Sequence, residues 1–246
     1  MIGNIHKNLN KTDIQMTILM LITVSLSVIN AYLTPLYQFR YIVATILMIV
    51  LFLIVHFSSK NRKVLIEISV IGLIAGFVEL LADYFLVLNA GLKYNTLELF
   101  ILESPFYMPF AWSFIIIQLG YVGYRLYDGL GKIKGTLITG FIGSIYVGLA
   151  EMLAHNGNLW KYSQAPLSYI HHSPLYIILG EGLMFSLLVL LLREDHIFDL
   201  DKIPRNYVIS RNIVNKGLFK GTLFGFIIFL SYVTTFYSMT LLSWLI

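Results

Sequence analysis

Long apolar segments alternate with short polar ones along the chain, and the pattern predicts membrane-spanning helices. A helix needs about 20 mostly apolar residues to cross a bilayer. Seven segments come close to this length and predict seven transmembrane helices, at residues 14–33, 40–57, 64–88, 105–127, 134–154, 174–192 and 217–244. The first lacks a small-x-small cleavage site, so we expect it to be retained as a helix. Residues 1–246 are therefore expected to form a single seven-helix membrane domain.

The amino-acid composition agrees with the predicted membrane helices and narrows the fold class. Hydrophobic residues make up 58% of the 246 residues and charged residues 12%, whereas a soluble domain carries about 25% charged residues. The fold class indicated is an all-α integral membrane protein. A formal net charge of +4 would suggest nucleic acid in a soluble protein, but no such motif is present, so no nucleic-acid partner is expected. The absence of cysteine excludes disulfides, thiolate metal sites and a cysteine nucleophile.

The basic residues lie almost entirely on one side of the predicted helices. Of the 17 Lys and Arg residues, all but Arg40, Lys93 and Lys161 fall on the side of the N-terminus. Because basic residues are enriched in cytoplasmic loops, we expect the N-terminus in the cytoplasm and the C-terminus outside. Acidic residues among the cytoplasmic basic ones, such as Asp13 and Glu67, are expected to be solvated surface charges without a role.

One stretch in the middle of the chain occurs twice, with its polar residues in the same order. The matching pieces are Glu79 to Asp83 and Glu151 to His155, then Lys93-Tyr94 and Lys161-Tyr162, then Glu103-Ser104-Pro105 and His172-Ser173-Pro174. This recurrence predicts an internal repeat over approximately 75–127 and 147–192. Helices three and five both run outward, so the pairs 3–4 and 5–6 form a parallel repeat whose copies are related by an axis along the membrane normal.

Acidic residues of the repeated stretch are the main candidates for chemistry. Glu79 lies about 22 Å along its helix at the usual rise per residue, where a carboxylate costs about 2.5 to 3.5 kcal/mol. It should therefore face the bundle interior or a wet cavity, with Asp83 one turn further on the same face. Glu151 and His155 are expected to repeat this geometry. Glu181 adds another intramembrane carboxylate.

The loops and helix starts beside these acids supply further candidates. The two Ser-Pro pairs are typical of helix N-termini, and Glu103 and His172, which precede them, are expected to point at the acids. The proposed catalytic set is Glu79, Asp83, Glu103, Glu151, His155, His172 and Glu181. Aromatic side chains of the loops are expected to cover the cavity as lids. The proposed lining set is Tyr94, Tyr107, Trp112, Trp160, Tyr162 and Tyr176.

The first copy also resembles a known group of proteins. Its Glu79, Gly91-x-x-Tyr94 loop and Pro105, Pro109 and Trp112 are similar to the polytopic carotenoid-biosynthesis membrane proteins, which include bacterioruberin-type carotenoid hydratases. The run Glu103 to Trp112 also resembles an uncharacterised bacterial membrane-protein family. The resemblance covers mainly residues 75–185, and it implies isoprenoid chemistry in a bacterial cytoplasmic membrane. The second copy departs from the hydratase-like pattern at His155 and His172.

The leading interpretation is an intramembrane hydratase or cyclase that acts on a membrane lipid or isoprenoid in a cavity facing the outer leaflet. A neutral carboxylic acid, Glu79 or Glu151, would protonate an alkene, and no cofactor is required. Asp83 and aromatic faces would stabilise the carbocation.

Two alternatives stay open. In the first, the chain is a metal-dependent lipid hydrolase or oxidase with a site suited to Zn, Fe or Mn. Its candidate ligands are Glu79, Asp83, Glu151, His155, His172 and Glu181. In the second, the outward-facing acids bind a cation or relay protons in a transporter, because membrane acids mark ion paths as well as catalytic sites.

Overall fold

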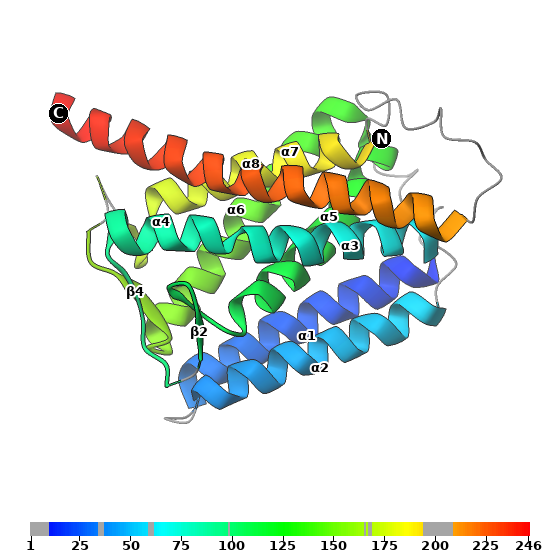
Figure 1. The fold of residues 1–246 in the computed structure, drawn as a ribbon, viewed down its shortest axis with the longest axis horizontal. Helices are drawn as coiled ribbons and strands as arrows, with labels where there is room; N and C mark the ends of the chain where they lie inside the picture. The colour runs from blue at the N-terminus through cyan, green and yellow to red at the C-terminus, as the bar shows by residue number, and fades with distance from the viewer. Residues whose placement is uncertain are drawn as a thin grey trace.

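The computed structural model describes residues 10–33, 37–58, 62–97, 99–164, 166, 169–193 and 209–246, and these are mostly helical (Figure 1). The helices are α1 (Lys11–Leu33), α2 (Tyr37–Ser58), α3 (Arg62–Val78), α4 (Leu80–Ala90), α5 (Met108–Leu130), α6 (Lys132–Asn156), α7 (Leu175–Arg193) and α8 (Ile209–Leu245). The strands are β1 (Leu92–Tyr94), β2 (Phe100–Ile101), β3 (Ser104–Pro105), β4 (Trp160–Tyr162), β5 (Tyr169–Ile170) and β6 (Ser173–Pro174). Each predicted apolar segment corresponds to one of these helices or, for 64–88, to two, although the first residues of 105–127 and 174–192 lie outside a helix.

Several of these helices have the length and composition of membrane spans. Within the described ranges, five candidate spans are Lys11–Ile29, Arg62–Ala90, Lys132–Asn156, Leu175–Arg193 and Ile213–Leu245. The part of α2 from Thr45 to Phe57 is a shorter apolar helix. These helices fit an all-α integral membrane protein.

The predicted helix 64–88 is divided at Glu79. The amide N–H of Ala82 donates to the carbonyl of Glu79 at 2.7 Å, a bond across three residues that marks one tighter turn between α3 and α4. The helix ends at Gly91, whose φ of 62° lies in the left-handed region that glycine adopts without strain. Glu79 and Asp83 lie in the later part of this helical column, at the same end of the bundle as the strands (Figure 1).

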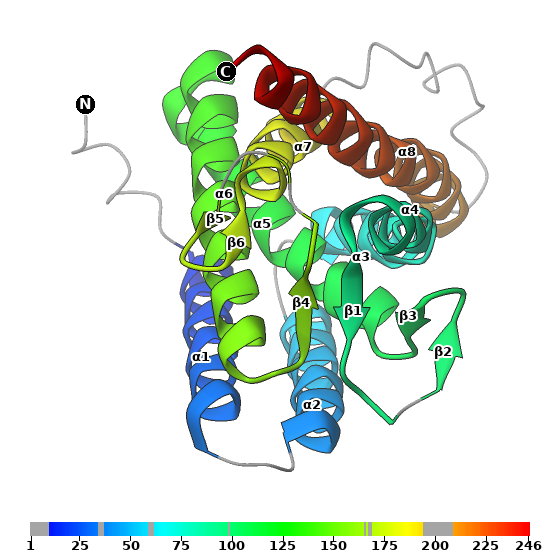
Figure 2. The same ribbon diagram turned by 90° about the vertical axis from the view of Figure 1, so that its left-hand side faces the viewer.

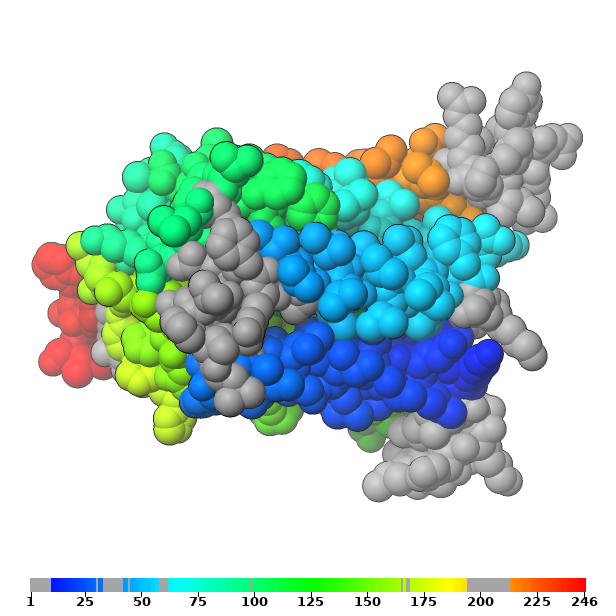
Figure 3. Space-filling view, turned by 90° about the horizontal axis from the view of Figure 1, so that it is seen from below, coloured from blue at the N-terminus to red at the C-terminus, as the bar shows by residue number. Residues whose placement is uncertain are grey.

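Five helical columns form the core, and α1 and α2 lie against one side of it. The core consists of α3 with α4, α5, α6, α7 and α8, and Figure 2 views the bundle from the end that carries the strands. Figure 3 shows α1 and α2 side by side on one face. Two pairs of core helices approach closely at a glycine. A Cβ added at Gly72 of α3 would lie 2.8 Å from the carbonyl oxygen of Ser113 in α5. A Cβ added at Gly140 of α6 would lie 2.5 Å from the carbonyl oxygen of Gly182 in α7. Such contacts let helix backbones meet directly.

Three short antiparallel ribbons occupy one end of the bundle, which we call the ribbon end. β1 pairs with β4, with Lys93 opposite Lys161 at the centre of the register. β2 pairs with β3, and β5 pairs with β6, each through a two-residue turn. The prediction that the Ser-Pro pairs begin helices is wrong in detail, because both pairs lie in strands. α5 begins only at Met108, whereas α7 begins directly after Pro174.

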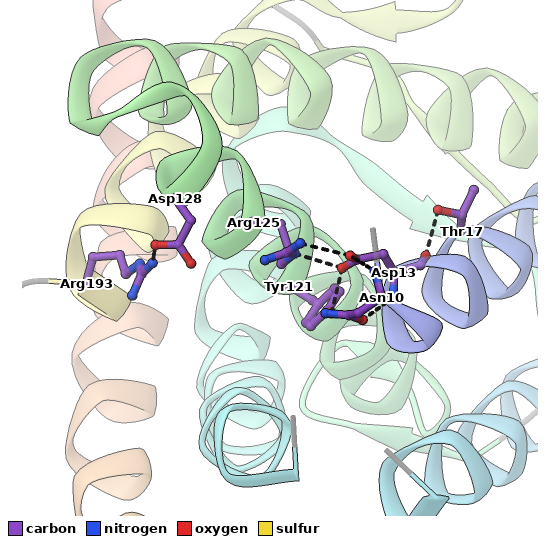
Figure 4. Close-up of polar contacts among 7 residues, drawn as sticks. All are labelled: Asn10, Asp13, Thr17, Tyr121, Arg125, Asp128 and Arg193. Atoms are coloured by element: carbon purple, nitrogen blue, oxygen red, sulfur yellow. Dashed lines mark hydrogen bonds and ion pairs between the residues drawn. The ribbon is translucent and has the colours of Figure 1, made fainter. Parts of the chain in front are cut away.

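The opposite end, which we call the ion-pair end, is held by charged residues (Figure 4). Arg125 donates to both oxygens of Asp13, at 2.8 and 2.9 Å, and the Tyr121 hydroxyl donates to the same carboxylate at 2.8 Å. Asp13 is buried, so the expectation that it is a solvated surface charge is wrong. Figure 4 also shows the ion pair between Arg193 and Asp128.

A second charged contact at the ion-pair end joins α8 to α3. The Lys220 ammonium donates to Glu67 at 2.9 Å, and Lys220 is only 1% exposed. Glu67 therefore has a structural partner, whereas the sequence suggested a surface charge without a role. Breaking a buried pair leaves an uncompensated charge, which makes such pairs costly to disrupt.

Candidate functional site

Four carboxyl groups are buried together near the ribbon end. Glu79 and Glu181 are 0% exposed, Asp83 is 4% exposed and Glu151 is 9% exposed. They come from the α3–α4 turn, α4, α6 and α7, so the site draws on both helix pairs of the predicted repeat. Each acid lies among apolar core side chains, where an ionised carboxylate is stable only with hydrogen-bond donors or opposite charge.

Asp83 receives its donors from the ribbon end. Its Oδ2 accepts hydrogen bonds from the Tyr94 hydroxyl at 2.5 Å and from the Ser104 hydroxyl at 2.7 Å. β1 carries Tyr94 back over the end of α4, and β3 carries Ser104. Burial, and then the charge of Asp83, raise the pKa of the Tyr94 phenol well above its ordinary value. The phenol is therefore a neutral, constant donor to Asp83.

Glu151 has a matching set of donors on β4. Trp160 Nε1 donates to Oε2 at 2.8 Å, and the Tyr162 hydroxyl donates to Oε1 at 3.3 Å. Burial, followed by the charge of Glu151, raises the pKa of the Tyr162 phenol. The tyrosine follows its acid by 11 residues both here and at Asp83. By this hydrogen-bonding pattern, Glu151 of the second copy is equivalent to Asp83 of the first. The sequence comparison had instead aligned Glu151 with Glu79.

Glu79 and Glu181 are less completely hydrogen-bonded. The Tyr232 hydroxyl of α8 donates to Oε1 of Glu181, and Oε2 accepts no hydrogen bond from the described residues. Neither oxygen of Glu79 accepts one from the described residues either. Glu79 lies beside Asp83, with Glu181 and Glu151 as its next acidic neighbours. Two touching carboxyls in apolar surroundings share a proton, because two adjacent anions repel each other.

A small cavity of about 40 Å³ opens between these groups. That volume is enough for more than one water molecule or for a reacting group of a larger molecule. Its wall combines two acids with aromatic rings and apolar side chains. The lining residues are Asp83, Leu86, Tyr94, Met108, Ala111, Trp112, Ile115, Val147, Ala150, Glu151, Trp160, Tyr162 and Tyr232.

Aromatic rings from separate elements close around this cavity. Tyr94 packs against Trp160, with ring centroids 5.9 Å apart, and Trp112 meets Tyr232 edge to face at 6.5 Å. Tyr176 is fully buried and packs edge-on against Tyr162 at 6.4 Å. The predicted lining residues Tyr94, Trp112, Trp160 and Tyr162 thus line the cavity, and Tyr176 stands behind it.

Glu79 and Glu181, like Tyr176, are buried near the cavity without lining it. Four further predicted site residues, Glu103, His155, His172 and Tyr107, are not part of its wall either. Glu103 and His172 occupy the turns of the β2–β3 and β5–β6 hairpins and are exposed. Both are exposed in these turns, whereas the acids are buried, so they do not pack against the acids as predicted. His172 instead stacks on His155, with ring centroids 4.0 Å apart and an interplanar angle of 4°. The prediction that His155 repeats the geometry of Asp83 is therefore wrong.

Tyr107, the fourth of these residues, is buried in the core just before α5 and does not line the cavity.

Two residues of the site, Ser104 and Tyr232, were not predicted from the sequence. Ser104 was interpreted as a helix cap, but its hydroxyl binds Asp83. Tyr232 lies inside the long apolar α8, and its only signal was a polar Ser231-Tyr232 pair within an apolar run.

The positions of the candidate ligands also bear on the alternative that the protein binds a metal ion. Among the described residues, no group of three or more His, Cys, Asp and Glu side chains is placed to hold a metal ion. The candidate ligands divide into four buried acids and a stacked histidine pair at the rim. Such a set of carboxyls with phenol and indole donors is suited to holding and moving a proton.

Comparison with known proteins gives one match. Neither a curated protein nor a solved structure matches the chain. A family model matches residues 80–239, which begin at the first residue of α4 and end within α8. The matched range contains Asp83, Glu151, Glu181 and Tyr232, together with the ribbons that supply their donors. The chain belongs to the family described as Domain of unknown function (DUF6989).

Proposed function

We propose that the chain is an integral membrane enzyme that transfers a proton to an alkene of a lipophilic isoprenoid or lipid, as a hydratase or cyclase. The observation that carries this proposal is the pairing of Glu79 with Asp83. Asp83 accepts two hydroxyl hydrogen bonds, which favour its anionic form. Glu79 accepts none from the described residues, so it is the member of the pair suited to carry the proton.

In the proposed reaction, Glu79 is the proton donor, and Asp83 and Glu151 are proton acceptors. Glu79 gives its proton to one alkene carbon, the π electrons form the new C–H bond, and the other carbon becomes a cation. In hydration, water adds to the cation and loses a proton to a carboxylate. In cyclisation, a second double bond adds and the adjacent C–H proton goes to the carboxylate. Asp83 and Glu151 are the acceptors within reach of the cavity, and the proton returns to Glu79.

The walls of the cavity support a cationic intermediate. Trp112, Trp160 and Tyr232 offer aromatic faces and edges around it, and aromatic faces stabilise cations when water is excluded. The carboxylates add opposite charge in the same apolar surroundings. The resemblance of the segment from Glu79 to Trp112 to carotenoid hydratases agrees with this chemistry.

We also propose that the chain crosses the bacterial inner membrane seven times, with its N-terminus in the cytoplasm. The five candidate spans, the apolar α2 and the α5 column support this count. The ribbon end would then face outward and the ion-pair end would face the cytoplasm. The equivalent glycine contacts and the equal acid-to-tyrosine spacing of 11 residues support the internal parallel repeat.

The test compares Glu79→Gln with Glu103→Gln. Glutamine keeps the shape of the carboxyl but cannot donate a carboxylic acid proton, so Glu79→Gln is expected to lower product formation by at least about a hundredfold, the usual worth of a general acid. Glu103 is exposed in a turn, and its variant should keep full activity. Lipid extracts of cells with and without each variant provide the measurement. Full conversion by Glu79→Gln would refute the proposal.

Proton-coupled transport is the second candidate, because the four buried acids form one electrostatically connected group. Lipid extracts would then be the same with and without the protein. Proteoliposomes would instead show a proton flux that Glu79→Gln abolishes. The two outcomes separate a transporter from an enzyme.

A further inference from the structure

A second cavity, of about 70 Å³, lies beside the acid site between α1, α2, α5 and α6. Ala111, Ile115 and Ala150 line both cavities. The two spaces therefore adjoin at a wall made of two methyl groups and one isoleucine. Two of these three shared side chains are alanines, so little side-chain volume separates the two cavities there.

The wall of the second cavity suits a hydrocarbon. Most of its lining residues are apolar, among them Val24, Leu26 and Phe114. The hydroxyls of Thr23 and Ser27 donate to the backbone carbonyls of Leu19 and Thr23 in their own helix. These internal bonds satisfy the polar atoms and leave little for a polar ligand to bind.

A buried polar group is hydrogen-bonded to two residues of this cavity's wall, Thr23 and Tyr146. Gln118 is 0% exposed, donates to Thr23 at 2.9 Å and accepts from the Tyr146 hydroxyl at 3.0 Å. Gln118 follows Trp112 by six residues on α5, which corresponds to about 9 Å along the helix. Gln118 is therefore farther from the ribbons than Trp112, and its hydrogen bonds fix two side chains of the cavity wall.

The contacts that hold α1 to the core differ between its two ends. At the ion-pair end, the buried Asp13 accepts two hydrogen bonds from Arg125. At the ribbon end, an exposed hydrogen bond of 3.0 Å joins Asn156 to Tyr32. There Gly157 also meets the backbone of Ala31, with 3.2 Å from a Cβ built on the glycine to the Ala31 Cα. Figure 2 shows α1 beside α6 at this end. The ribbon half of α1 is therefore the easier half to displace.

We infer that the second cavity binds the hydrocarbon chain of the substrate, and that the chain reaches it when α1 and α6 part at the ribbon end. This inference rests on the proposed function, because it gives the reacting alkene a position beside Glu79 and the remaining chain a place to lie. The substrate class is a lipid whose apolar chain continues past the reacting double bond.

The first experiment uses photoreactive lipids and the full-length protein in lipid nanodiscs. The probes are geranylgeraniol and palmitic acid, each with a diazirine at the end of the chain. We expect light-dependent labelling of the cavity segments of α1 and α5. Ala150→Phe should lower this labelling by about tenfold or more, because the ring fills the place where the two cavities adjoin. Ile145→Phe, on the exposed face of α6, is the matched control and should label like the unmodified protein.

The second experiment locks the proposed opening. The chain has no cysteine, so Ala31→Cys combined with Gly157→Cys introduces a single pair at the point where α1 meets the C-terminal end of α6. Oxidation should reduce probe labelling several-fold, and reductant should restore it in the same sample.

The outcomes separate the two proposals. Equal labelling of Ala150→Phe and the unmodified protein would overturn the chain-binding cavity. Labelling that the disulfide does not change would overturn the opening between α1 and α6. Glu79→Gln should still be labelled while losing conversion. If Glu79→Gln keeps both labelling and conversion, the acid mechanism fails and the cavity stands. Preference for one probe identifies an isoprenoid or an acyl chain.

Discussion

At the scale of single residues, the site depends on neutral donors brought to buried acids. Tyr94 and Tyr162 come from ribbons outside the helices, and each hydroxyl points back at one carboxyl. A phenol that ionised here would place a second negative charge beside an acid. Burial and this neighbouring charge both raise the pKa of Tyr94 and Tyr162.

The raised pKa predicts how stability depends on alkaline pH. The ordinary pKa of tyrosine is 10.0, so above this pH the unfolded chain loses a proton that the folded protein retains. The stability is present below pH 10 and is lost as the pH rises toward the folded-state pKa, by about 1.4 kcal/mol per pH unit for each such tyrosine. Thermal unfolding in detergent should show that Tyr94→Phe loses stability less steeply than the unmodified protein.

Tyr84 offers the control for this measurement. It is 42% exposed on α4, so Tyr84→Phe controls for the loss of a phenol hydroxyl outside the site. Equal slopes for Tyr94→Phe and the unmodified protein would show that the Tyr94 phenol does not stay protonated in the folded state.

At the scale of elements, the apolar pattern predicts helices well but does not predict how their ends connect. Each predicted segment corresponds to one or two helices because about 20 apolar residues leave the backbone no better partner than itself. The strands were missed because they contain only two or three residues. Their pairing, such as Lys93 with Lys161, is set by the positions of distant helices rather than by local propensity.

The same limit explains which site residues were predicted. Glu79 and Asp83 could be recognised because an acid in an apolar helix must face the interior. Glu103 and His172 were misplaced because their positions depend on hairpin turns. Tyr232 could not be recognised, because a tyrosine in a membrane helix is common and only the fold brings it to Glu181.

The glycine contacts between helices give a prediction at this scale. An alanine methyl at Gly72 or Gly140 would lie 2.8 or 2.5 Å from a carbonyl oxygen of the facing helix. The helices would have to separate, so Gly72→Ala and Gly140→Ala should each destabilise the protein by about 1 to 3 kcal/mol. Gly148→Ala is the matched control on α6, because its nearest neighbour would be 3.6 Å away. Denaturant unfolding in mixed micelles measures the difference, and similar losses at Gly148 and Gly140 would contradict it.

At the scale of the whole molecule, the proposed seven-span arrangement would place the ribbon end and the C-terminus outside the cell. The chain lacks cysteine, so single substitutions report on sidedness without background. A membrane-impermeant maleimide should label Leu99→Cys and Ile246→Cys in intact cells. Lys132→Cys, at the ion-pair end of α6, should be labelled only after permeabilisation. Labelling of Lys132→Cys in intact cells would reverse the orientation.

The ion pair between Lys220 and Glu67 has a consequence for how the protein is made. Lys220 is almost fully buried, and its partner lies 153 residues earlier in the chain. A lone ammonium within a membrane helix costs about 2.5 to 3.5 kcal/mol. Because α3 precedes α8 in the chain, Glu67 is synthesised before Lys220 and can receive the lysine as α8 emerges. We therefore expect α8 to dock on α3 as it enters the membrane, because docking spares the lysine from meeting lipid unpaired.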